Sequence, residues 1–163
     1  MEKIEDLIIN KIYEFINCAL SKVIKPDIKI HQVKELDNET IKEIKEQYGI
    51  EGIILDVDET LRKRMRDIPK CNQEWIDRLK EEFKIIIVSN GKDKNLERYF
   101  NEKGIDYIGF ACKPLKTNFK EACRRMDLKP EEVLVVGNSL FCDIYGGKKN
   151  KMKTVLVGDV VQK

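Results

Sequence analysis

The chain of 163 residues is long enough for one domain with a sizeable core, but short for two. Hydrophobic residues make up 42% of it, a share that favours a folded protein over a disordered one. Lys and Arg total 31 against 29 Asp and Glu, so the net charge gives no reason to expect nucleic acid as a partner.

Five cysteines lie at positions 18, 71, 112, 123 and 142. No two of them form a Cys-x-x-Cys pair, and one histidine cannot complete a zinc site. We therefore expect reduced thiols in a cytoplasmic protein, most of them small buried hydrophobic side chains. The chain shows neither the pattern of a signal peptide nor an apolar run of membrane-spanning length.

The first predicted element is an amphipathic helix over residues 2–24, which we treat as a segment apart from the main domain at 25–163. Its polar stripe has mixed charge, unlike the basic face typical of membrane-surface helices. We expect the helix to pack against its own domain or against a second copy in a homodimer, with membrane contact as the alternative. The stripe consists of Lys3, Asp6, Asn10, Glu14, Asn17 and Ser21.

The remaining elements alternate between strands and helices. Residues 28–33 predict a short strand, and 38–49 a helix with Asn38 or Thr40 as its N-cap and Gly49 at its end. Further strands are expected at 52–57, 84–90, 107–111, 131–138 and 153–158, and helices at 71–83, 93–104, 117–128 and 141–150. Continuously apolar strands in this alternation indicate an α/β fold with a doubly wound, Rossmann-like parallel sheet, which binds ligands beyond the carboxyl ends of its strands.

Polar side chains follow four of these strands. Taken singly, Asp-x-Asp is more often a turn or an exposed pair, Lys113 could be a surface lysine, and Asn90-Gly91 could be only a turn. Because the carboxyl ends of parallel strands meet at one edge, we expect these side chains to converge there. In chain order they are Asp56, Asp58 and Thr60; Ser89 and Asn90; Lys113 before Pro114; and Asn138, Ser139 and Asp143.

The order DVDET, VSN, KP and GNSLFCD resembles the four motifs of the haloacid dehalogenase (HAD) superfamily. Over residues 25–160 the likeness is greatest to subfamily IIIA, which contains phosphatidylglycerophosphate phosphatases. The resemblance implies a HAD core without a large cap domain and a Mg²⁺-dependent phosphomonoester hydrolase that acts through an aspartyl-phosphate. It also implies phosphatidylglycerophosphate as the substrate.

The resemblance also implies a role for each site residue. Asp56 would be the nucleophile, Asp58 the general acid and base, and Lys113 the group that neutralises charge on the phosphoryl group. Thr60 would hold the nucleophile loop, and Ser89 and Asn90 would contact substrate. The Mg²⁺ ligands would be the Asp56 carboxylate, the Asp58 backbone carbonyl, Asp143 and Asn138.

The fourth motif departs from the family pattern at Asn138, where aspartate is common. The site loses one negative charge there, which should lower metal affinity and leaves a phosphate- or Mg²⁺-binding module with weak catalysis as one alternative. Cys142, next to Asp143, is expected to be a packing residue, because no histidine lies near it in sequence to activate the thiol.

The spacing between motifs leaves no room for a cap domain. From Thr60 to Ser89 there is one loop and one helix, and from Ser89 to Lys113 one helix and one strand. A site without a lid suits a lipid phosphate at a membrane, a phosphorylated macromolecule or a partner that supplies a lid; a soluble phosphate is the other enzyme alternative.

The cations of Arg62–Arg66 could attract the inner face of an anionic membrane, with Met65 among the head groups, or could form a solvated flap.

Overall fold

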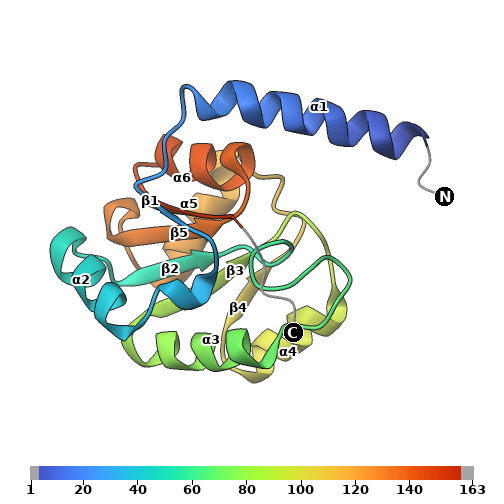
Figure 1. Ribbon diagram of the computed structural model, residues 1–163. Helices are drawn as coiled ribbons and strands as arrows, with labels where there is room; N and C mark the ends of the chain where they lie inside the picture. The colour runs from blue at the N-terminus through green and yellow to red at the C-terminus, as the bar shows by residue number, and fades with distance from the viewer. Residues whose placement is uncertain (1–3, 159–163) are drawn as a thin grey trace.

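The computed structural model describes residues 4–158, apart from the side chains of residues 4–7, 10, 13 and 17. A six-stranded parallel sheet in the order β1-β6-β5-β2-β3-β4 forms its centre (Figure 1). The strands are β1 (Ile28–Ile30), β2 (Gly52–Leu55), β3 (Lys84–Val88), β4 (Asp106–Ile108), β5 (Val133–Gly137) and β6 (Lys153–Val157). The doubly wound parallel sheet expected from the sequence is confirmed.

One helix precedes β1 and the others lie between strands, and each is close to its predicted position. They are α1 (Ile4–Ser21), α2 (Asn38–Tyr48), α3 (Lys70–Glu82), α4 (Lys94–Glu102), α5 (Lys116–Met126) and α6 (Gly146–Lys149). Three short turns of other helix types complete the chain: η1 (Val33–Glu35), η2 (Pro130–Glu132) and the π-helical η3 (Leu140–Tyr145). The helix expected over 141–150 is thus divided into η3 and α6.

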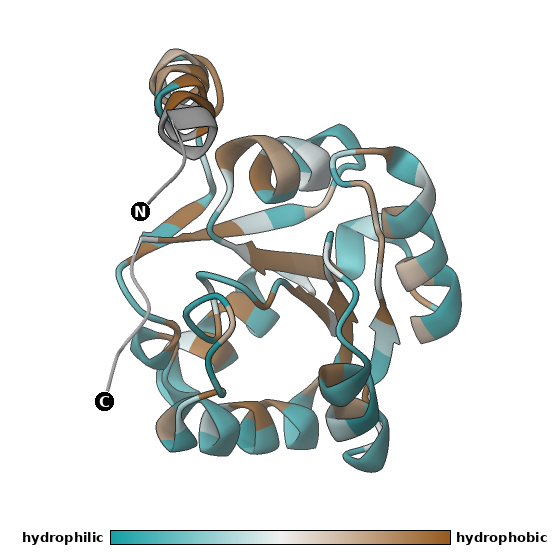
Figure 2. Ribbon diagram, turned by 90° about the vertical axis from the view of Figure 1, so that its right-hand side faces the viewer, coloured by the Kyte–Doolittle hydropathy of each residue, from teal (hydrophilic) through white to brown (hydrophobic). Residues whose placement is uncertain are grey.

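Alternate residues of the central strands are buried on opposite faces of the sheet. Ile53 and Leu55 of β2 face a core formed with α2, α3 and α4, whereas Ile54 faces a second core formed with α5. All four β2 residues are buried, which explains the continuous apolar runs in the sequence. Figure 2 shows these hydrophobic strands enclosed between helices whose outer faces are more polar.

The helix ends depend on local side-chain contacts. The N-cap of α2 is Asp37, whose carboxylate accepts a hydrogen bond from the Thr40 backbone N–H, so the predicted caps Asn38 and Thr40 were wrong by one residue or more. The predicted end at Gly49 is confirmed, with φ of 66°. Asp93 caps α4 by accepting hydrogen bonds from the backbone N–H groups of Asn95 and Leu96.

Helix α1 lies along one side of the domain and contacts η3 (Figure 1). Its described large apolar side chains are exposed, contrary to the expectation that the helix might pack against its own core. The physical reason is that α6 and η3 already cover that part of the sheet. Lys3 and the side chains of Asp6, Asn10 and Asn17 in the predicted polar stripe lie outside the described residues. The exposed apolar side chains are Ile8, Ile9, Ile12, Phe15, Ile16 and, just after the helix, Val23.

All five cysteines are free thiols, as expected, but their predicted burial was wrong for most of them. Cys18, Cys71 and Cys112 are exposed, Cys142 is partly buried and only Cys123 lies in the core. The exposed three lie on outer helix positions and in a loop, where exposing a small thiol side chain to water has little effect on stability. None of the helices in the described part of the chain is long and apolar enough to cross a bilayer.

Candidate active site

The predicted site residues meet at the carboxyl edge of the sheet, where the strand order reverses. Chain connections run from β2 outward to β3 and β4, and then return to β5 on the other side of β2. Such a reversal leaves a crevice between the loops of the two neighbouring strands. Asp56 directly follows β2 and extends its pairing, since the Asp56 N–H donates to the Val136 carbonyl of β5 at 3.0 Å.

Asp56 is the centre of a buried polar cluster. Lys113 Nζ donates to Asp56 Oδ1 at 2.7 Å and to Asp143 Oδ1 at 2.6 Å, and Thr60 Oγ1 donates to Asp56 Oδ2 at 3.0 Å. All four side chains belong to residues that are at most 8% exposed. Residues from three separate motifs therefore meet at this carboxylate, and Thr60 contacts it directly.

The electrostatics of this cluster follow from burial and close charges. Burial and the neighbouring Asp143 carboxylate raise the pKa of Asp56 to about 6, against the opposing effect of Lys113. Burial disfavours the charge of Lys113, but Asp143 and Asp56 outweigh it and hold the pKa of Lys113 above its ordinary value. Lys113 therefore stays charged at neutral pH, and it can stabilise negative charge on Asp56 or on a bound phosphoryl group.

Gly137 makes room for the Asp143 carboxylate. A Cβ at position 137 would lie 2.3 Å from Asp143 Cγ, closer than any real contact. The other Asp143 oxygen, Oδ2, accepts a hydrogen bond from the Ser139 N–H at 3.1 Å. The glycine of the fourth motif is thus a steric requirement of the site, and the sequence analysis did not identify it.

Asn90 connects three of the motif loops. Its Oδ1 accepts a hydrogen bond from the Lys113 backbone N–H at 2.7 Å, and its Nδ2 donates to Cys142 Sγ at 3.6 Å. Asn90 is therefore more than a turn residue.

Ser89 is 4% exposed, and its Oγ accepts a hydrogen bond from the Gly91 N–H. Burial raises the pKa of the Cys142 thiol, so the thiol is mostly protonated at neutral pH.

Asp58 lies at the open side of the cluster, with a side chain that is 33% exposed. Its Oδ1 accepts a hydrogen bond from Arg62 Nε at 2.9 Å, and Arg62 Nη2 donates to Asp93 Oδ2 at 3.2 Å. Arg62 is only 7% exposed. Its predicted place on a basic rim was therefore wrong, because the guanidinium is turned inward between two carboxylates. Neither this pairing nor the part played by Asp93 could be read from the RKRMR run.

The rest of the basic run is more exposed. Lys63 Nζ donates to Glu59 Oε2 at 3.0 Å, and Arg64, Met65 and Arg66 are exposed. Glu59 and Met65 have positive φ angles, as do Phe110 and Cys112 in the loop before Lys113. Left-handed residues other than glycine concentrate at functional loops, and here they shape the two loops that flank Asp58 and Lys113.

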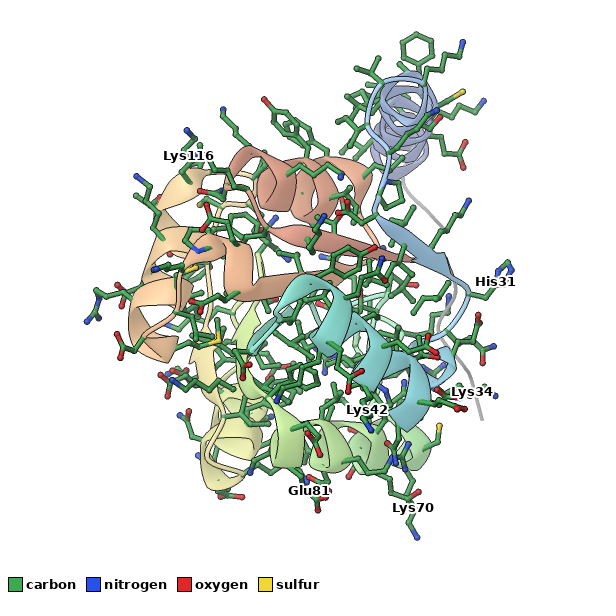
Figure 3. All side chains as sticks on the ribbon, turned by 90° about the vertical axis from the view of Figure 1, so that its left-hand side faces the viewer. His31, Lys34, Lys42, Lys70, Glu81 and Lys116 are labelled. Atoms are coloured by element: carbon green, nitrogen blue, oxygen red, sulfur yellow. The ribbon has the colours of Figure 1, made fainter. Side chains whose placement is uncertain are left out.

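The oxygen atoms at this edge suit a metal ion that the protein coordinates only in part. Among residues 4–158, no three His, Cys, Asp or Glu side chains are grouped to hold an ion. The lone histidine, His31, points away from the body of the domain (Figure 3). Mg²⁺, however, is typically bound by one or two carboxylates, with waters and substrate phosphate completing its shell. The converging carboxylates of Asp56 and Asp143 fit that ion and not one that needs a full protein cage.

The structure also bears out the absence of a large cap. The chain between Thr60 and Ser89 forms one loop, α3 and β3, and that between Ser89 and Lys113 forms α4 and β4. The site is therefore open on the side of Asp58.

Comparisons with known proteins show which families and proteins this chain is similar to. A family model described as haloacid dehalogenase-like hydrolase matches residues 29–150. The chain is 36% identical over 141 residues to the probable phosphatase YqeG of Bacillus subtilis, covering 85% of this chain and 79% of that protein. It is 30% identical over 100 residues to a glyceraldehyde 3-phosphate phosphatase of Pyrococcus furiosus, covering 56% of this chain and 42% of that protein.

A solved structure shares the fold. The cobalt-bound deoxy-D-mannose-octulosonate 8-phosphate phosphatase from Haemophilus influenzae aligns with a TM-score of 0.52 and 18% identity, covering 68% of this chain and 81% of that one. At that identity the likeness shows the fold alone.

Proposed function

Because the chain belongs to the haloacid dehalogenase-like hydrolase family and is a phosphatase, we propose that it hydrolyses its phosphomonoester through an aspartyl-phosphate on Asp56. The observation that carries this proposal is the buried Asp56 carboxylate held by Lys113 and Thr60, with Asp58 two residues further along the chain. A fixed nucleophile beside a fixed cation divides one difficult hydrolysis into two easier steps.

In the first step, an Asp56 oxygen bonds to phosphorus while the bond from phosphorus to the ester oxygen breaks. Asp58 supplies the proton that the leaving oxygen needs. In the second step, water attacks phosphorus, Asp58 takes a proton from it, and the bond to Asp56 breaks to release inorganic phosphate. Lys113 stabilises the negative charge in both steps, and Ser89 and Asn90 border the position of the phosphoryl oxygens.

We propose Mg²⁺ as the cofactor, held by the Asp56 carboxylate, the Asp58 carbonyl, Asp143 and Asn138. When bound, Mg²⁺ supplies positive charge for the phosphoryl oxygens. The support for this proposal is that Asp56 and Asp143 both lie within hydrogen-bond distance of Lys113 Nζ, which makes this a region of concentrated negative charge.

For the substrate we propose phosphatidylglycerophosphate at the cytoplasmic face of a membrane. The loops of the open site carry exposed apolar side chains, namely Met65 (85% exposed), Phe110 (62%), Leu115 (60%) and Phe141 (40%). Arg64 and Arg66 are exposed on the same loop as Met65. Apolar side chains next to cations suit an anionic lipid surface, to which each nearby cation adds about 1 kcal/mol.

We also propose that the apolar face of α1 is covered by a second copy of the chain. With on the order of 150–200 Å² for each large side chain, the exposed fractions of the six apolar residues amount to roughly 600 Å². Two such faces would bury roughly 1,200 Å², which reaches the lower limit of stable protein interfaces.

The test of function is phosphate release in the presence of Mg²⁺, with Asp56→Asn as the control. Phosphatidylglycerophosphate in mixed micelles would be compared with an aryl phosphate and a panel of sugar and nucleotide monophosphates. Asp56-dependent release that is fastest from the lipid would support the proposal. Faster release from a soluble compound would keep the mechanism and reject the lipid. No release from any substrate would favour a binding module limited by Asn138.

A further inference from the structure

Arg62 makes three charge-assisted hydrogen bonds inside the protein. Its Nε donates to Asp58 Oδ1 at 2.9 Å, its Nη2 to Asp93 Oδ2 at 3.2 Å, and its Nη1 to the Arg66 carbonyl at 3.1 Å. The side chain is 8% exposed. An arginine in this position holds its partners more rigidly than a lysine could, because its donors form a planar fork.

The partners of Arg62 are themselves fixed. Asp93 Oδ1 accepts hydrogen bonds from the N–H groups of Asn95 and Leu96 at 2.9 and 3.1 Å, so this carboxylate is anchored to the first turn of α4. The hydrogen bond to the Arg66 carbonyl closes the 62–66 loop on itself. A continuous chain of contacts therefore runs from α4 through Asp93 and Arg62 to Asp58.

Arg62 contacts only one of the two Asp58 carboxylate oxygens, Oδ1. The other, Oδ2, faces the loop after β3, since a Cβ built on Gly91 would lie 4.0 Å from it. Ser89 and Asn90, which border the expected phosphoryl position, are in that same loop. One oxygen is thus used to fix the carboxylate, while Oδ2 is turned toward the loop that carries Ser89 and Asn90.

We propose that Arg62 is a positioning residue, which together with Asp93 holds Asp58 in the orientation needed to protonate the leaving group. This inference rests on the proposed function. Proton transfer requires the acid to be within hydrogen-bond reach of the leaving oxygen, and small displacements of such a group cost large factors in rate. A free Asp58 side chain at the open edge of the site would rotate among several positions.

The experiment measures kcat/KM for soluble phosphate esters whose leaving groups differ in basicity. The series runs from 4-nitrophenyl phosphate, which needs little help from an acid, through phenyl phosphate to an alkyl phosphate. In Arg62→Gln we expect a loss on the order of 10²-fold with the alkyl ester, and of less than about fivefold with the nitrophenyl ester. Arg62→Lys should recover part of the loss, and Asp93→Asn should show a weaker form of it.

Two controls separate positioning from a general structural effect. Asp58→Asn should show the same dependence on the leaving group, and adding Arg62→Gln to it should change nothing further, because the acid is already absent. Arg98→Gln, the same substitution at an exposed arginine of α4, should leave the whole series unchanged.

Equal losses for all esters in Arg62→Gln would overturn the inference, because they would show only that the loop or the fold had changed. Further loss in the Asp58→Asn background would do the same. If the wild-type protein showed no Asp56-dependent release from any ester, the proposed function and this inference would both fail. The two failures are thus distinguishable by the wild-type activity.

Discussion

Lys113 reaches Asp56 across 57 residues of sequence, with its Nζ 2.7 Å from Asp56 Oδ1. The same nitrogen lies 2.6 Å from Asp143 Oδ1, so one cation bridges two buried carboxylates. This relationship fixes Asp56, Lys113 and the fourth motif relative to one another. It is also the reason why a single substitution at Lys113 should affect both stability and turnover.

Lys113→Met should leave two buried carboxylates without their cation. We expect a loss of about 3–5 kcal/mol in the free energy of unfolding in chelator, measured by denaturant titration, and a fall of about 10²–10³-fold in kcat. Lys116→Met is the matched control, because Lys116 is an exposed lysine three residues away (Figure 3). Unfolding curves that coincide for Lys113→Met and Lys116→Met would contradict the cluster described here.

The rate should fall in acid because Asp56, the proposed nucleophile, must be ionised to attack phosphorus. With the pKa of Asp56 raised to about 6, kcat/KM should drop below that pH in limiting Mg²⁺. The added positive charge of Mg²⁺ favours the ionised carboxylate, so a higher Mg²⁺ concentration should move the acid limb to lower pH. The measurement is a set of pH–rate profiles at several Mg²⁺ concentrations. A limb that stays at the same pH throughout would argue that Mg²⁺ is not next to Asp56.

Asn138→Asp would restore the carboxylate that the family pattern has at this position. The added negative charge should lower the Mg²⁺ concentration for half-maximal activity by about threefold to tenfold. It should also increase the rise in melting temperature that Mg²⁺ produces, a readout that does not depend on turnover. An unchanged Mg²⁺ titration would exclude Asn138 from the metal site.

Gly137→Ala places a methyl group into the Asp143 carboxylate. Because the built Cβ lies 2.3 Å from Asp143 Cγ, the fourth motif must shift, and we expect a cost of about 2 kcal/mol or more together with strongly reduced activity. Gly158→Ala is the comparison, since its nearest neighbour would be 3.5 Å away. Equal thermal melts for the two variants would show that the site can accommodate the methyl group.

The exposed apolar face of α1 should determine whether the protein is a dimer or a monomer in solution. Ile12→Glu together with Phe15→Glu should convert a dimer into a monomer in light scattering, because charges would be placed within the apolar face. Glu14→Gln, an exposed substitution on the polar side, should leave the mass unchanged. A wild-type monomer whose α1 variants instead lose binding to anionic vesicles would show that lipid covers this face.

The sequence by itself determined the sheet and the principal site residues. Short, continuous apolar runs such as GIIL, alternating with helical patterns, indicate parallel strands covered on both faces, and polar residues that follow such strands meet at one edge. Asp56, Thr60, Lys113 and Asp143 could therefore be placed together before any coordinates, because strand direction alone brings them to that edge.

Only the tertiary structure decided how side chains pair across that edge. Arg62 is one of several adjacent cations in sequence, and its inward turn depends on Asp93, 31 residues away. Asn90 acts through Lys113 and Cys142, which belong to other loops. The open face of α1 likewise depends on what α6 and η3 already cover. Local periodicity carries no information on such partners, because it is the folded distance between them that decides each interaction.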